Sequence, residues 1–65
     1  MLTAEELNKL INRITETAYA VGDVLNRHLD AGDITEEQAQ ALRLAAANLT
    51  VANQEIWPLY QAAKE

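Results

Sequence analysis

Apolar residues recur at alternating spacings of three and four along two long segments of the chain. The columns of the first segment are Leu7, Ile14, Val21 and His28, and Ile11, Ala18 and Leu25. Those of the second segment are Leu42, Leu49, Ile56 and Ala63, and Ala45, Ala52 and Leu59. This spacing places both columns of a segment on one helix face and is typical of a coiled coil. The pattern predicts two amphipathic helices that pack along a shared seam.

Both helices are expected to begin at a capping box. In "LTAEEL", Thr3 precedes Glu6 by three positions, and in "ITEEQA", Thr35 precedes Gln38 in the same way. Each threonine hydroxyl can accept from the N–H of the third helical residue, whose side chain accepts from the threonine N–H. Between them, Gly32 suits the left-handed residue that follows a helix end. We therefore expect one domain over residues 1–65, with helix 1 over about 4–30, a turn at 31–34 and helix 2 over about 36–63.

So short a turn forces the helices to run antiparallel, which predicts an all-α hairpin resembling an antiparallel coiled coil. Folding the chain back about the turn places Gly22 opposite the region of Leu44. Small residues of both helices meet near the middle of the seam: Ala18, Gly22, Ala45 and Ala52. They predict that the two backbones approach closely at this level.

The stretch "EIWPLYQ" interrupts the second helix with its only proline. Pro58 has no N–H to bond with the carbonyl of Gln54, and its ring crowds the preceding turn. The apolar rhythm of Ile56, Leu59 and Ala63 nevertheless continues past the proline. We expect a helix that continues with a kink near residues 57–58.

A hairpin of 65 residues has too little core to be stable alone, because many of its hydrophobic residues are alanines. The chain has no cysteine for disulfides, so a second subunit is the remaining means of stabilisation. Apolar side chains outside the seam predict a homodimer interface, made of Leu10, Val24, Leu44 and Val51. The product is a four-helix bundle that resembles the plasmid copy-number regulator Rop in length and layout only. The alternative is a solvated face of low charge.

Three aromatic side chains are the candidates for binding another protein, namely Trp57, Tyr60 and Tyr19. Tryptophan and tyrosine dominate binding hot spots, which makes an interface one interpretation. The interpretation ranked first is structural: Trp57 and Tyr60 cover the open end of the bundle against Leu2, Glu6 and Leu10, and Tyr19 is a partly exposed packing residue.

The chain lacks the usual groups of an active site. Serine and cysteine are absent, and the paired glutamates fall in first helical turns, where capping explains them. His28 stands with Asp30 and Asp33 at the turn, where we favour a capping role over a metal site. We therefore predict no catalytic residues, no cofactor, no metal and no small-molecule substrate.

The net charge of −5 argues against nucleic acid as a partner, because phosphate binding requires a basic surface. The acidic N-terminus does not resemble a secretion signal and no apolar run spans a membrane, so we expect a soluble cytoplasmic protein. The function expected from these features is that of a small regulator or inhibitor that docks, as a dimer, on a partner protein. A Rop-like RNA regulator and an assembly adaptor for a helical client are the alternatives.

Overall fold

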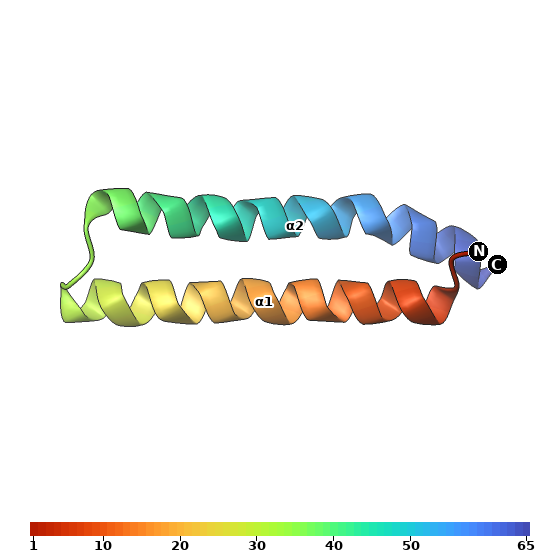
Figure 1. Ribbon diagram of the computed structural model, residues 1–65, viewed down its shortest axis with the longest axis horizontal. Helices are drawn as coiled ribbons and strands as arrows, with labels where there is room; N and C mark the ends of the chain where they lie inside the picture. The colour runs from red at the N-terminus through yellow and green to blue at the C-terminus, as the bar shows by residue number, and fades with distance from the viewer.

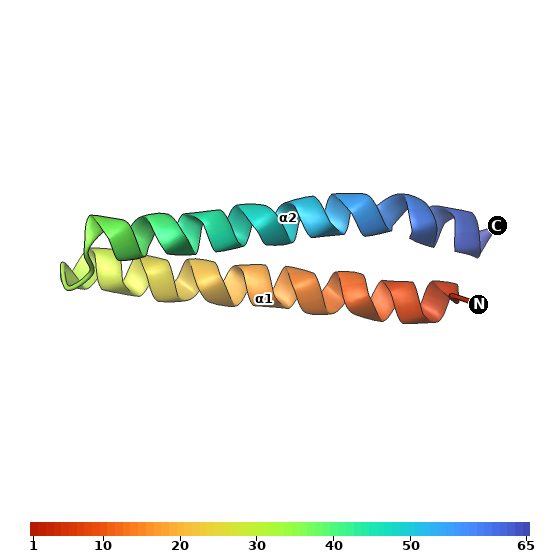
Figure 2. The same cartoon turned by 45° about the horizontal axis from the view of Figure 1, so that its top comes forward.

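The computed structural model describes all 65 residues and contains two antiparallel helices, α1 (Ala4–Ala31) and α2 (Glu36–Lys64) (Figure 1). The Cα atoms extend over 48 × 15 × 14 Å. Two views 45° apart show the helices side by side along their length, with both termini at the same end (Figure 2). The predicted all-α antiparallel hairpin is confirmed.

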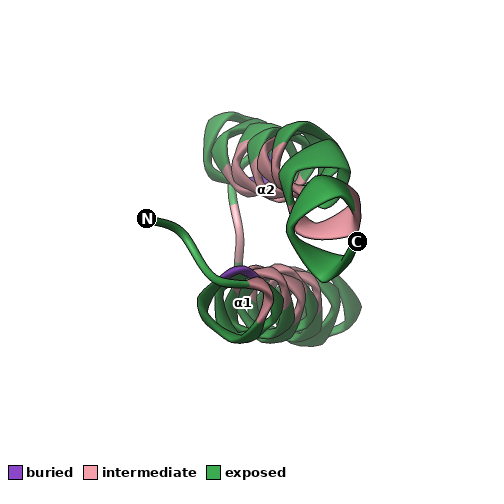
Figure 3. Cartoon of the chain, turned by 90° about the vertical axis from the view of Figure 1, so that its right-hand side faces the viewer, coloured by how far each residue is buried: buried purple, intermediate pink, exposed green.

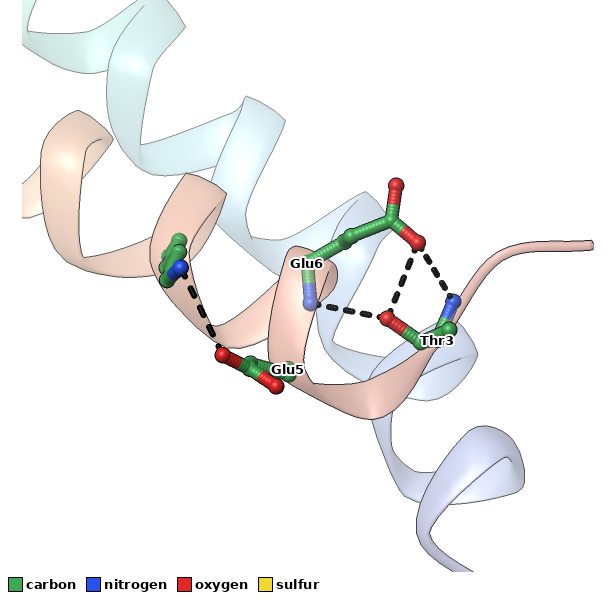
Figure 4. A network of polar contacts seen from close by, with 4 residues as sticks. Thr3, Glu5 and Glu6 are labelled. Carbon is green, nitrogen blue, oxygen red and sulfur yellow. Dashed lines mark hydrogen bonds and ion pairs between the residues drawn. The ribbon is translucent and has the colours of Figure 1, made fainter.

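Both helices start at the expected capping boxes. Thr3 Oγ1 accepts from the N–H of Glu6 at 3.1 Å, and Glu6 Oε1 accepts from the N–H of Thr3 at 3.2 Å (Figure 4). Thr35 and Gln38 form the same two bonds, each at 3.0 Å. Each box satisfies amide groups that have no partner within the helix, and so it fixes the residue at which the helix begins.

The two most buried side chains follow these caps directly. Leu7 is 2% exposed and Ala39 is 1% exposed, and each is the fourth helical residue after its capping threonine. They lie near opposite ends of the hairpin. Between them, the facing sides of α1 and α2 carry side chains of intermediate burial (Figure 3). The hairpin therefore has a thin core, which is fully closed only where a cap anchors the adjacent turn.

The turn depends on Gly32, which adopts the left-handed conformation with φ 69° and ψ 25°. Its N–H donates to the carbonyls of His28 at 2.9 Å and Leu29 at 3.2 Å, which closes the end of α1. His28 was expected in the seam, but its side chain is exposed and its Nδ1 lies 2.7 Å from Asp33 Oδ1. The seam column therefore ends before His28, because this side chain reaches over the turn instead of toward α2.

The seam of α2 differs from the prediction in its second column. Leu42, Leu49 and Ile56 are half-buried as expected, and the column that accompanies them consists of Ala39, Ala46, Asn53 and Tyr60. The predicted Leu59 and Ala63 are exposed, while Ala45 and Ala52 are half-buried. The true column was missed because it contains an asparagine and a tyrosine, which an apolar periodicity does not register.

The expected close approach at Gly22 is also absent. A Cβ atom added there would meet no other atom within 4 Å. Packing against α2 therefore does not require a glycine at position 22.

The helix α2 continues through Pro58, and its last turns bend toward α1 (Figure 1). The end-on view shows these turns displaced from the axis of the rest of α2 (Figure 3). A bend at this point follows from the missing N–H and the bulk of the proline ring. It sets the direction of the last turns, which carry Tyr60 and Lys64.

Candidate functional site

An open groove of about 570 Å³ runs between the two helices along one side of the hairpin. Its lining comes equally from both helices and contains no charged side chain: Ile11, Thr15, Ala18 and Tyr19 of α1, and Thr50, Asn53, Gln54 and Trp57 of α2. Aliphatic, hydroxyl and amide groups alternate along it. Such a surface can hold both apolar and hydrogen-bonding groups of a ligand.

Two large aromatic side chains line the groove from opposite helices. Tyr19 of α1 is 72% exposed and Trp57 of α2 is 50% exposed. The structure thus brings together two of the three aromatic residues proposed to contact a partner, although they are far apart in the sequence. Neither side chain is fully packed against the hairpin, so both present apolar area to the solvent.

Tyr60, the third of these residues, lies behind Trp57 and does not line the groove. The two ring centroids are 5.4 Å apart with an interplanar angle of 43°. Lys64 Nζ lies 5.4 Å from the centroid of the Tyr60 ring. Tyr60 is half-buried in the seam, so its ring restricts the orientations open to Trp57. Tyr60 therefore supports Trp57, which lines the groove.

The floor of the groove holds a polar pair that sequence reasoning missed. Asn53 Nδ2 donates to Thr15 Oγ1 at 3.0 Å, and the Thr15 hydroxyl donates to the carbonyl of Ile11 at 2.9 Å. Asn53 Oδ1 is buried without any hydrogen-bond partner. An unsatisfied acceptor of this kind costs about 1–3 kcal/mol. The signal in the sequence was the seven-residue spacing that joins Asn53 to Ala39, Ala46 and Tyr60. A single asparagine in such a heptad column is known from coiled coils, where it sets the register of the helices at a cost in stability.

The side of the hairpin opposite the groove carries several exposed aliphatic side chains among polar ones, which include Thr17, Asn48 and Glu55. Each of the four side chains proposed for a dimer interface is exposed and immediately precedes a half-buried residue: Leu10, Val24, Leu44 and Val51. The groove residues Tyr19, Thr50, Gln54 and Trp57 instead immediately follow one. Each residue turns the helix by about 100°, so preceding and following positions lie on opposite sides of the seam. Because the helices are antiparallel, residues that follow a seam residue lie on the same side of the hairpin in both helices. Residues that precede a seam residue lie on the other side.

Leu59 also belongs to this aliphatic side, although it was assigned to the seam. It is 50% exposed and precedes the half-buried Tyr60. Folding the chain about the turn places Leu59 near the level of Leu10, at the open end of the hairpin. Leu44 and Val51 lie farther back on α2, so they form the outer edge of this side. The aliphatic side is defined below as Leu10, Val24, Leu44, Val51 and Leu59.

The total accessible surface is large for a chain of this mass. A compact monomer of 7.2 kDa has about 4,100 Å² of accessible surface, whereas the hairpin has 4953 Å². The difference has the size of the ~800 Å² that each partner contributes to a standard protein interface. The excess follows from the elongated shape, because a hairpin of 48 × 15 × 14 Å leaves more of its surface accessible than a compact particle of the same mass.

Acidic side chains and the single histidine do not gather into a site of their own. The structure contains no group of three or more His, Cys, Asp or Glu side chains placed to hold a metal ion. His28 pairs with Asp33 alone.

Neither α1 nor α2 has the length and hydropathy needed to cross a membrane. Comparison with protein-family models, curated proteins and solved structures found no match to this chain.

Proposed function

We propose that this protein is a small non-enzymatic regulator that binds another protein through the groove between α1 and α2. The observation that supports this most directly is the placing of Tyr19 and Trp57, both largely exposed, on the two helices that form one uncharged groove. Rigid aromatic side chains contribute large contact areas at a low cost in entropy, and they dominate binding hot spots.

The active form in this proposal is a dimer in which the aliphatic sides of two hairpins pack together as a four-helix bundle. Only Leu7 and Ala39 are fully buried in the single hairpin, and a chain of this size with so small a core usually needs a second subunit. From Leu44 to Gln54 the chain of α2 carries no charged side chain. Burying this stretch between two subunits therefore removes no charged group from water. The groove is on the other side and stays open in such a dimer.

Sedimentation of two charge variants tests the dimer. Leu44→Glu places a carboxylate on the aliphatic side and should convert the dimer to a monomer with lower helicity, because a charge buried between subunits without a partner is costly. Asn12→Glu makes the same change in charge on exposed α1 surface away from this side and should leave the dimer intact. A wild-type chain that sediments as a monomer at micromolar concentration contradicts the dimer, as does a Leu44→Glu variant that stays dimeric.

Site-specific photocrosslinking in the native cell tests the groove. A benzophenone amino acid in place of Tyr19 should crosslink one partner protein, because this position is 72% exposed at the edge of the groove. The same group in place of Arg13, which lines no part of the groove, is the control and should not crosslink that partner. Trp57→Ala in the chain that carries the crosslinker at position 19 should reduce the yield. Equal crosslinking from positions 13 and 19 would contradict the proposal.

A further inference from the structure

We infer that the groove receives an amphipathic helix of the partner protein, and that this helix carries basic residues at heptad spacing along the edge that meets α1. This inference rests on the proposed function and names the chemistry of the partner. Three features carry it: the direction of the groove, the composition of its lining, and a row of carboxylates beside it.

The direction and lining of the groove fit a helix. The groove follows the axes of α1 and α2, and a third helix packs into such a furrow at about 8–10 Å from each neighbour. Ile11 and Ala18 present apolar surface two turns apart, which matches the anchor spacing of an amphipathic helix. Thr50 and Gln54 supply hydrogen-bonding groups on the side of α2.

The carboxylates form a row on α1 that begins beside the groove and continues past its last lining residue, Tyr19, toward the turn. Glu16 stands three residues before Tyr19 and Asp23 stands four residues after it, and residues at these spacings are neighbours on a helix surface. Asp30 follows Asp23 by a further seven residues. Successive members of the row are about 10 Å apart along the helix axis, since each residue rises 1.5 Å. A partner helix with basic residues seven apart would meet all three.

No ion pair within the hairpin uses this row. The three ion pairs present join Lys9 to Glu5, His28 to Asp33, and Arg43 to Glu36. Arg13 and Arg27 are helix-surface neighbours of the row, three or four residues from its members, but neither guanidinium forms an ion pair with them. The carboxylates are therefore available to a partner, and the net charge of −5 adds a general attraction for a basic segment.

Two synthetic peptides serve as the probe. Both are tryptophan-free amphipathic helices of 24 residues with the same apolar face, and they carry either Lys or Glu at one flanking position of every heptad. Trp57 is the only tryptophan of the chain and lines the groove, so its fluorescence reports binding directly. We expect saturable binding of the Lys peptide, weakening as salt rises, and at least about tenfold weaker binding of the Glu peptide.

A matched pair of variants separates the row from net charge. In the first, Glu16→Gln, Asp23→Asn and Asp30→Asn remove the row. In the second, Glu37→Gln, Glu55→Gln and Glu65→Gln remove three other unpaired carboxylates and leave the same net charge. The first variant should bind the Lys peptide about tenfold more weakly, whereas the second should change the affinity by no more than about twofold.

Each other outcome has a definite meaning. Equal weakening by both variants would show attraction by net charge alone and overturn the inference. Equal binding of both peptides would leave a helix-binding groove, as the proposed function requires, but refute the basic partner. If neither peptide changes the Trp57 signal, the helical occupant is wrong, while crosslinking at position 19 still decides the proposed function. A signal that saturates with protein concentration alone would place a second copy of the chain in the groove and overturn the inference.

Discussion

Replacing Asn53 with leucine should stabilise the hairpin. The substitution removes the buried Oδ1 that has no partner, a group that costs about 1–3 kcal/mol. It also removes the bond from Nδ2 to Thr15 Oγ1, which contributes about 0.5–1.5 kcal/mol. The Thr15 hydroxyl keeps its bond to the carbonyl of Ile11, so no new unsatisfied group is created. Leucine also adds apolar area at a seam position, and the net gain is about 1–2 kcal/mol.

Thermal unfolding followed by circular dichroism measures this gain. A domain of this size shifts its Tm by about 4–8 °C for each kcal/mol, so Asn53→Leu should melt about 5–15 °C higher than the wild type. The melts must be run at several protein concentrations, because the stability of a dimer depends on concentration. Asn26→Leu is the matched control, since it makes the same change at an exposed position of α1 and should shift stability by less than about 0.5 kcal/mol.

A Tm that stays level with the control, or falls below it, would refute this reasoning. It would mean that the amide of Asn53 is fully satisfied in the folded protein, and that the polar pair with Thr15 contributes to stability. If the Tm rises as we expect, stability does not explain the presence of Asn53 at this position, and another role must do so. At a heptad position, a single asparagine fixes the register of paired helices.

Two glycines give opposite predictions for the same change. Gly22→Ala should stabilise the hairpin by about 0.5–1 kcal/mol, because Gly22 is helical and a Cβ there meets nothing within 4 Å. Gly32→Ala should destabilise it by about 1–2 kcal/mol, because Gly32 has φ 69°. Urea unfolding of both variants beside the wild type measures the differences. A destabilised Gly22→Ala would reveal a close approach at this level, and an unchanged Gly32→Ala would show that the turn does not need a left-handed residue.

The hairpin was predictable from the sequence because its strongest signals are local. A capping box needs only Thr3 and Glu6, or Thr35 and Gln38, and Gly32 marks the turn between the helices. The seam of α1 was also predictable as far as Leu25, since its columns are apolar throughout. These features are decided within one or two helical turns, where the sequence is sufficient.

The seam of α2 was not decided locally. Leu42, Leu49 and Ile56 can be accompanied by either of two neighbouring columns, and the apolar pattern favoured the one that contains Leu59. In the structure the column of Asn53 and Tyr60 is in the seam throughout, whereas the predicted column is half-buried at Ala45 and Ala52 and exposed at Leu59. A hydrogen bond to Thr15 on the other helix makes the asparagine acceptable there, and such a contact depends on a register that the sequence of α2 alone does not contain.

The groove could be predicted only in part. Tyr19 and Trp57 were each identified as candidates for binding a partner, without an expectation that they line one groove. Each immediately follows a seam residue, Ala18 or Ile56, and in antiparallel helices these positions share one side. The rule that joins the two aromatics was thus present in the pattern. The polar floor required the packed structure, because it arises from a contact between the helices, whereas the bend near Pro58 follows from the proline itself.

The division of the hairpin into two sides has a consequence for binding strength. If the dimer forms through the aliphatic side, its two grooves face outward and can engage two helices at once, which raises binding to a multivalent surface by about 10²–10⁴-fold over one groove. The folded fraction of the Leu44→Glu variant, measured by circular dichroism, should then bind the free Lys peptide with unchanged affinity, because this residue lies outside the groove. The same variant should dissociate much faster than the wild type from a surface densely coated with that peptide. Surface plasmon resonance at low and high peptide density measures both quantities. A variant that loses affinity for the free peptide would contradict the separation of the two sides, since dimerisation would then be needed to form the groove itself.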